Sequence, residues 1–203
     1  MSRTKLVGVL VLSVLLLAAI GCSSKKVVSR VDAEETIDLS GNWNDTDSRL
    51  VADEMITDAM ARPWLDSHLR DKGKNPAIIV GAIKNLTDEH IATGTFVGDI
   101  ERAFVNSGTV RVVAKPDERE GVREERQDQQ ANAAIETVKE FGMELGADYM
   151  MIGEINKILD QEGREQVAFY QVDLTLTDMQ SNEKVWIGQK KLKKYIARKP
   201  YKP

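Results

Sequence analysis

The sequence contains few of the residues that provide covalent cross-links, metal ligands or rigid linkers. Its 203 residues include one cysteine, two histidines and five prolines. A single cysteine cannot form an intramolecular disulfide, so packing alone must stabilise any folded domain. The 28 basic residues do not outnumber the 32 acidic ones, so there is no basic surplus for binding nucleic acid. No nucleic-acid partner is therefore expected.

The single cysteine, Cys22, stands at the end of a hydrophobic run. Two basic residues precede an uncharged stretch, 6–20, and a polar segment follows the cysteine. This order is typical of a secretory signal, and the run is short for a membrane span, which needs about 20 residues. The stretch 19–22, Ala-Ile-Gly-Cys, resembles a bacterial lipobox. It predicts removal of residues 1–21 and lipidation of Cys22; the alternative is an ordinary signal peptide or a short anchor.

A polar segment separates the cysteine from the first folded pattern. Residues 23–38 mix both charges and contain little to bury, which is typical of a flexible tether. Fully extended, this tether would reach only about 55 Å. The predicted organisation is therefore a signal over 1–21, a lipidated tether over 22–38 and a single domain over 39–203.

The domain begins with helical patterns. Apolar spacing predicts a helix capped by Asp45, Thr46 or Asp47, with a kink or a second helix at Pro63. A second pattern covers 95–108. A charged stretch beginning at 115 is predicted to become an amphipathic helix that Gly146 ends. The residues predicted to face inward are Leu50, Val51, Met55, Ile56, Met60, Leu65, Phe96, Ile100, Phe104, Val105, Ala134, Ile135, Val138, Phe141 and Leu145.

Strand patterns alternate with the helices. Residues 77–85 are apolar on both faces, as in a central strand, and the last two strands form a hairpin. This order predicts an α/β (α+β) fold, with a mixed sheet of about four strands and helices packed on its faces. The segments predicted as strands are 77–85, 109–114, 148–158, 167–179 and 185–196.

The residues of catalysis and metal binding are sparse. His68 and His90 have no partners at metal-ligand spacing, and both are predicted to be surface or capping residues. The acids of 44–49 indicate helix capping rather than calcium binding, because the glycine and distal glutamate of an EF-hand are absent. Asp99 and Glu101 lie on different faces of a helix, which argues against a hydrolase pair. We predict no catalytic residue, metal or cofactor, and favour a binding or regulatory protein.

Two charged segments have simpler explanations. Residues 118–129 carry both signs and are predicted to form a solvated helix face. Lys190–Lys194 is predicted to guard an edge strand against strand addition, with contact to a membrane surface as the alternative.

Five stretches together resemble the LpoB family of penicillin-binding-protein activator lipoproteins. They cover 41–56, 85–113, 118–130, 146–155 and 170–196. The resemblance implies a fold similar to the N-terminal domain of TolB. It also implies an outer-membrane lipoprotein that faces the periplasm, binds the regulatory domain of a class A penicillin-binding protein and stimulates it. No enzymatic activity and no small-molecule substrate are implied.

The family resemblance also implies where the partner binds. It points to Asn85 and Thr87, after the first strand, and to Glu183 in the terminal hairpin. Each residue has an alternative role in turn geometry or as a plain exposed side chain. Further exposed candidates are Asp88, Glu89, His90 and Arg123.

The tether departs from the family pattern. Well-known activators carry a long proline-rich tether, whereas residues 23–38 are short and contain no proline. The short tether implies either a partner that lies closer or a branch of the family in which the activation role does not hold. The alternative function is a structural or secretion-associated periplasmic lipoprotein similar to CsgG, whose core is related in shape.

Overall fold

The computed structural model describes residues 27–33, 35–134, 136–139, 142 and 144–197. The predicted signal and lipidation site at Cys22 lie outside these residues, as do Ile135 and Phe141 of the predicted third helix. The described part of the predicted tether contains neither helix nor strand. Residues from Thr36 onward form one compact unit.

A capping box starts the first helix, α2 (Asp45–Met60). The Asn44 side chain accepts a hydrogen bond from the Asp47 amide at 3.0 Å, and the Asp47 carboxylate accepts one from the Asn44 amide at 3.0 Å. Asn44 is thus the cap, and the prediction of Asp45, Thr46 or Asp47 was wrong. Pro63 does begin a second helix, α3 (Pro63–Lys72), whose first turn suits its fixed φ and missing amide.

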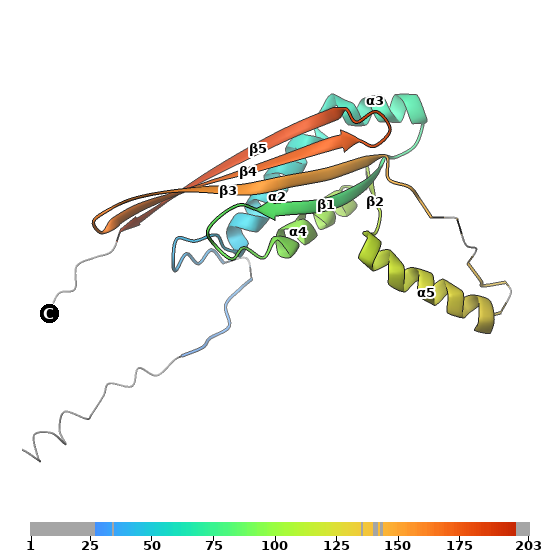
Figure 1. Cartoon of the computed structure of the whole chain (residues 1–203), viewed down its shortest axis with the longest axis horizontal. Helices are drawn as coiled ribbons and strands as arrows, with labels where there is room; N and C mark the ends of the chain where they lie inside the picture. The colour runs from blue at the N-terminus through green and yellow to red at the C-terminus, as the bar shows by residue number, and fades with distance from the viewer. Residues whose placement is uncertain (1–26, 34, 135, 140–141, 143, 198–203) are drawn as a thin grey trace, which may run out of the picture. The chain divides into compact units, whose positions relative to one another are not determined.

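The helices α2 and α4 (Thr93–Ser107) pack against each other beneath one face of the sheet (Figure 1). Most residues predicted to face inward do so, and Met60 is half-buried. Leu50 and Val105 were predicted wrongly, because their side chains are 51% and 57% exposed. Leu50 comes one residue before buried Val51, and Val105 comes one residue after buried Phe104. A step of one residue turns the side chain by about 100° around the helix, away from the buried stripe. The predicted residues of these helices that are buried are Val51, Met55, Ile56, Leu65, Phe96, Ile100 and Phe104.

The sheet has five strands in the order β2-β1-β3-β4-β5 (Figure 1). The α+β class is confirmed, although about four strands were predicted. The β1 strand is parallel to β2 and β3, and β3, β4 and β5 form an antiparallel meander. The strands are β1 (Ala77–Asn85), β2 (Arg111–Val112), β3 (Tyr149–Glu162), β4 (Glu165–Asp178) and β5 (Lys184–Ala197).

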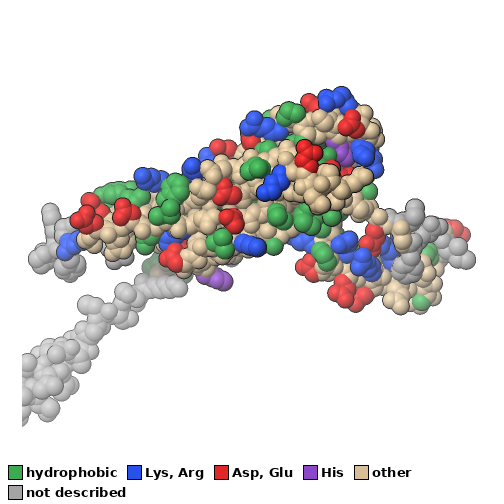
Figure 2. Space-filling model, turned by 45° about the horizontal axis from the view of Figure 1, so that its top comes forward, with side chains coloured by type: hydrophobic (Ala, Val, Ile, Leu, Met, Phe, Trp, Pro, Cys, Tyr) green, Lys and Arg blue, Asp and Glu red, His purple; other side chains and the backbone are tan. Residues whose placement is uncertain are grey.

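Alternation along β4 determines which face of the sheet is buried. Its inner residues meet the helices, and all five predicted for that face are at most 1% exposed: Ala168, Tyr170, Val172, Leu174 and Leu176. On the opposite face, Ile152, Ile158 and Ile187 are 44%, 65% and 65% exposed. Hydrophobic side chains lie between charged ones along the strands there (Figure 2). The sheet is thus covered by helices on one face at the positions of β4.

The fourth helix, α5 (Pro116–Asn132), forms on the charged stretch and buries none of its residues. The predicted amphipathic helix ending at Gly146 was wrong, because the described residues after Asn132 are not helical and Ala134 and Leu145 are exposed. Local chemistry favours the earlier segment. Proline occupies its first turn, and the Glu118 carboxylate accepts a hydrogen bond from the Lys115 amide at 2.8 Å.

Candidate functional site

The loop that follows β1 is folded by its own side chains. The side-chain amide nitrogen of Asn85 donates to the Glu89 carbonyl at 2.7 Å, and its side-chain oxygen accepts from the Thr87 backbone amide at 3.0 Å. The Thr87 hydroxyl in turn accepts from the Glu89 amide at 3.1 Å. The Leu86 amide donates to the carbonyl of Ile155 on β3 at 2.9 Å, which fixes the start of the loop to the sheet. Short polar side chains thus replace the missing backbone partners of a turn.

Side chains alternate between the inside and the outside of this loop. Asn85, Thr87 and Glu89 are half-buried, and their polar atoms hold the loop. The prediction that Glu89 is exposed was therefore wrong, because its carboxylate turns inward to Lys157 and Tyr170. The contact triplet, Leu86, Asp88 and His90, is exposed. The five predicted loop residues therefore lie together but divide into two roles. Asp88 and His90 are available to a partner, and the other three brace the loop.

Glu89 is the centre of a buried network. Its carboxylate accepts hydrogen bonds from the Tyr170 hydroxyl at 2.5 Å and the Trp43 amide at 2.9 Å, and it pairs with Lys157 at 2.7 Å. The Lys157 and Glu89 side chains are 5% and 10% exposed. Lys157 also reaches Asp88 at 2.9 Å. The network ties the loop to β3, β4 and the segment that precedes α2.

These contacts favour the ionised forms of the buried pair. Burial by itself would raise the pKa of Glu89, but hydrogen bonds from Lys157, Tyr170 and the Trp43 amide hold that pKa below its usual value. Burial would likewise lower the pKa of Lys157, and the carboxylates of Glu89 and Asp88 raise it instead. Glu89 is therefore a charged brace at neutral pH.

A hollow of about 610 Å³ lies beside the loop and is open to solvent. It lies between the loop, the distal parts of β3 and β4 and the segment before α2. Its residues are mainly polar, so it suits a polar protein contact better than an apolar small molecule. Those that line it include Ser40, Trp43, Asp88, His90, Lys157 and Gln166.

Arg123 lies apart from the loop, on α5. Its guanidinium binds the Glu144 carboxylate in a bidentate pair at 2.9 and 2.8 Å, and Arg126 reaches the same carboxylate at 2.9 Å. These hydrogen bonds lower the pKa of Glu144 to about 2, with the Arg123 bond as the largest cause. Arg123 therefore holds the chain after α5 against that helix.

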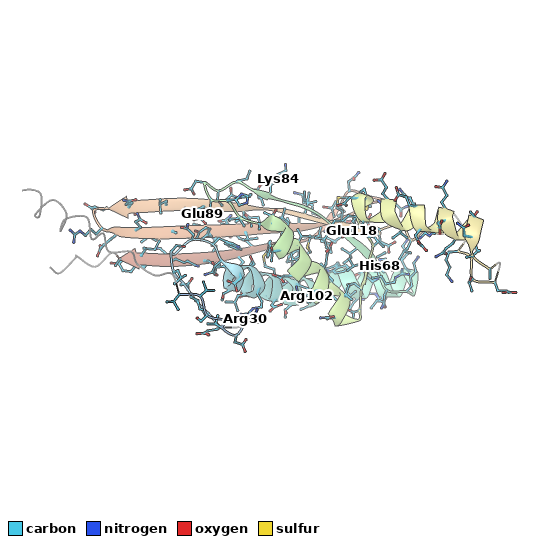
Figure 3. All side chains as sticks on the ribbon, turned by 90° about the horizontal axis from the view of Figure 1, so that it is seen from below. Arg30, His68, Lys84, Glu89, Arg102 and Glu118 are labelled. Atoms are coloured by element: carbon cyan, nitrogen blue, oxygen red, sulfur yellow. The ribbon has the colours of Figure 1, made fainter. Side chains whose placement is uncertain are left out.

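Glu183 lies in the β4–β5 turn, next to the start of β3. Because Asp178 pairs with Tyr149, this turn is at the end of the sheet where β1 begins, whereas Asn85 is at the end of β1. Nine residues of strand separate the two positions by about 26 Å. In Figure 3, Glu89 of the loop and His68 of α3 lie apart along the direction of the strands. The loop and the turn therefore do not form one continuous patch.

His68 is buried, so its prediction as a surface or capping residue was wrong. It shares a face of α3 with Trp64 and Leu65, and it is 4% exposed. Its Nδ1 is 3.0 Å from the Tyr149 hydroxyl, and its Nε2 is 3.9 Å from an Asp148 carboxylate oxygen. The helical spacing i, i+3, i+4 of this face could have indicated burial. His90 is exposed, as predicted.

We predict that His68 makes stability depend on pH. Burial lowers its pKa, opposed by Asp148 and assisted by Lys72, Lys74 and Arg111. The folded state thus binds fewer protons than the unfolded chain. Stability from this group is complete above the unfolded pKa of about 6.5 and is lost as pH falls through that value, by up to about 1.4 kcal/mol per pH unit.

Urea unfolding between about pH 7.5 and 5.5 tests this dependence in the range where histidine titrates. The parent should lose stability on acidification, and the His68→Gln variant should show a much flatter dependence. The matched control is His90→Gln, which alters the exposed histidine and should retain the parental slope. Equal slopes for the parent and His68→Gln would refute the assignment.

The carboxylates considered for hydrolysis are engaged elsewhere. Asp99 pairs with Arg102 at 3.0 Å, and Glu101 pairs with Lys115 at 2.9 Å. Within the part of the chain that the structure describes, no group of three potential metal-ligating side chains comes together. Nor does any helix in that part have the length and apolar character to cross a bilayer.

Sequence reasoning did not identify Leu86 or the residues that hold Glu89. Leu86 is 54% exposed in the loop. The sequence feature that could have indicated it is an isolated apolar residue between the polar Asn85 and Thr87. Trp43 and Tyr170 are 46 and 81 residues from Glu89 along the chain. No local pattern connects positions so far apart.

The described part of the chain is an α+β domain in which a braced loop lies beside a polar hollow. Residues 47–192 match the family model of the peptidoglycan-synthase activator LpoB. The chain therefore belongs to the LpoB family, a family of regulatory activators rather than enzymes, and the resemblance found in the sequence is confirmed. Family membership supports the general role of an activator lipoprotein. No curated protein matches the chain.

The solved structures that match the chain have little sequence identity to it. The C-terminal domain of LpoB from Salmonella enterica is 15% identical to this chain, with a TM-score of 0.33. The aligned region covers 64% of this chain and 93% of that domain. The Escherichia coli domain is 13% identical with a TM-score of 0.35, and covers 70% and 97%. Lipoprotein GNA1162 from Neisseria meningitidis is 16% identical with a TM-score of 0.34, and covers 59% and 84%.

Proposed function

We propose that this protein is an outer-membrane lipoprotein that binds and stimulates a class A penicillin-binding protein. Residues 1–21 are removed, Cys22 is lipidated, and the domain faces the periplasm. The partner surface is the regulatory domain of the synthase. The observation that supports this proposal, together with family membership, is the division of the loop. Asn85, Thr87 and Glu89 brace it, while the contact triplet remains exposed.

A preorganised loop suits this role because little conformational entropy is lost on binding. Leu86 provides an apolar contact, and Asp88 and His90 provide polar contacts at its rim. Arg123 and Glu183 are proposed as separate secondary contacts. Binding through the loop would leave the buried core unchanged.

Capture and rate measurements test the proposal together. The chain from Ser23 onward would be used as bait on an envelope extract from its own source. Any captured class A synthase would then be assayed for glycan polymerisation with and without the bait. Specific capture with a raised rate supports activation. Failure to capture a synthase, or capture without a rate change, would reject activation and favour the CsgG-type structural alternative.

We predict that the double variant Leu86→Ser/Asp88→Ala weakens synthase binding roughly tenfold, as expected for loss of a central contact. The matched control is Val105→Ser on α4, which alters a hydrophobic side chain 57% exposed, against 54% for Leu86. Titration of each variant against the captured synthase measures the effect. Equal affinity of both variants would place the contact surface elsewhere on the domain.

A further inference from the structure

A short segment crosses the domain before α2 begins. We call residues 38–44 the strap; it contains neither helix nor strand, and its last residue, Asn44, is the cap of α2. The strap leads into α2 next to the loop that follows β1 (Figure 1). It is bound to β5 through Lys194 and to the loop through Glu89. The strap therefore connects the chain that enters the domain to the proposed contact surface.

The first contact of the strap is with Lys194 of β5. The Lys194 ammonium binds the Asp38 carboxylate at 2.9 Å and the Asn42 carbonyl at 3.0 Å. The same ammonium pairs with Asp47, in the first turn of α2, at 2.6 Å, and the Lys194 side chain is 14% exposed. One largely buried cation thus holds both the strap and the start of α2.

Gly41 brings the backbone of the strap against β5. Its φ is +76°, in the left-handed region that favours glycine. An added Cβ would be 2.4 Å from Cγ1 of Ile196. A side chain at this position therefore strains the backbone and presses on Ile196, which weakens the docking of the strap.

The second contact of the strap is with Glu89 of the loop. The Trp43 amide donates a hydrogen bond to the Glu89 carboxylate at 2.9 Å, and the Trp43 ring packs edge-on against Tyr170, with ring centroids 5.6 Å apart. Glu89 in turn closes the loop, because its backbone amide and carbonyl bind the side chains of Thr87 and Asn85. Trp43 is therefore a positioning residue for the loop.

The strap buries little of its own surface. Leu39 is 93% exposed, so this large apolar side chain adds almost nothing to the docking. A segment with few buried apolar contacts opens at a lower free energy than the core of its domain. The capping box of α2 lies at Asn44, so opening of the strap can stop there and leave the helix intact. The exposed residues of the strap are Asp38, Leu39, Ser40 and Asn42.

We propose that the strap is a regulatory device that switches the contact triplet between a held and a free loop. In the docked state the strap holds Glu89, and with it the loop from which the triplet projects. In the released state Glu89 loses the Trp43 amide, and the loop gains freedom that a partner must then remove on binding. A pull on the chain before Asp38 acts first on the contact with Lys194, so a load on the tether reaches the loop through the strap.

The coupling between strap and loop is reciprocal, as linkage requires. A partner that binds the held loop also favours the docked strap, and a load that releases the strap weakens the binding of that partner. The consequence for a synthase rests on the proposed function. The coupling itself belongs to the domain alone and can be measured without a partner.

Native-state hydrogen exchange, measured by mass spectrometry, tests the coupling. The chain used begins at residue 23 and retains every buried residue found in the described part. Gly41→Ala should release the strap. Exchange in the peptides 41–44 and 85–91 should then rise together, each roughly tenfold, as expected for a side chain forced into the left-handed region. The loop peptide reports release because several of its amides are hydrogen-bonded in the held state.

The matched control is Gly73→Ala at the end of α3. Gly73 also has a left-handed φ, +65°, but an added Cβ there meets nothing within 4 Å. It precedes β1, whereas the loop follows that strand, so exchange in both peptides should stay unchanged. A second releasing variant, Asp38→Ala, removes the contact with Lys194 without straining the backbone. It should raise exchange in the same two peptides by a smaller common factor.

Two results would overturn the proposal. One is faster exchange in the strap peptide with an unchanged loop peptide. The other is unchanged exchange in both peptides of both releasing variants. Circular dichroism confirms that each variant folds, and Asp38→Ala decides the matter where Gly41→Ala does not fold. Failure of synthase capture alone would leave the exchange result intact, which separates this inference from the proposed function.

Discussion

Replacing Glu89 by alanine should lower the free energy of unfolding by about 3 kcal/mol, because a buried ion pair loses one partner. The substitution leaves the Lys157 ammonium with Asp88 alone, and it leaves the Tyr170 hydroxyl without its acceptor. Tyr170 is fully buried, so its hydroxyl cannot simply turn to water. Denaturant unfolding at neutral pH measures the loss.

Asp88→Ala is the matched control for this substitution. It removes the other carboxylate on the same lysine, but the Asp88 side chain is 69% exposed. Solvent already screens that pair, so its loss should be much smaller. Similar losses for the two variants would show that Glu89 is not the buried brace. Synthase binding should also weaken in Glu89→Ala, since the loop loses its attachment to Trp43 and Tyr170.

Local periodicity was sufficient for the elements that have one buried face. Alternation along β4 predicted which side chains enter the core, and Pro63 predicted a kink or a new helix, of which the structure shows the new helix, α3. Both signals operate over a few residues, where chain geometry fixes which side chains share a face. The fold class followed from the order of these elements.

The charged region around α5 shows where such patterns fail. An apolar stripe ending at Leu145 predicted a helix there, but the helix forms earlier, where Glu118 and Pro116 satisfy its first turn. Glu144 is then drawn back onto α5 by Arg123 and Arg126. Periodicity measures only the fit to a buried face, and this segment has no such face to cover it.

Only part of the candidate site could be predicted from the sequence. Family resemblance pointed to Asn85 and Thr87, and exposure was expected for Asp88, Glu89 and His90, but neither argument distinguished residues that brace the loop from residues that a partner could contact. That division depends on Lys157 and Tyr170, which the sheet brings beside Glu89 from positions far along the chain. A sequence motif covers only a few neighbouring residues, so it cannot indicate contacts between residues that are far apart along the chain.

The second large expected effect is the loss of stability in Gly153→Ala. Gly153 lies on β3, the strand between β1, which leads into the loop, and β4 of the core. It faces Leu174 on β4 and pairs with Ile83 on β1. An added Cβ would be 2.4 Å from the Asp173 carbonyl oxygen and 2.4 Å from a methyl group of Leu174. The carbonyl belongs to the backbone of a paired strand and cannot rotate away. Gly153→Ala should therefore destabilise the domain by about 3 kcal/mol through overpacking.

The control is Gly98→Ala in α4, where an added Cβ meets nothing within 4 Å. Alanine favours a helix, so this variant should be as stable as the parent or more stable by about 0.5–1 kcal/mol. A displaced β3 would also move Ile155, whose carbonyl holds the Leu86 amide. Gly153→Ala should thus weaken synthase binding even where the protein remains folded. Unfolding and binding titrations that left this variant unchanged would mean that β3 and β4 can separate without cost, and that the loop does not depend on their register.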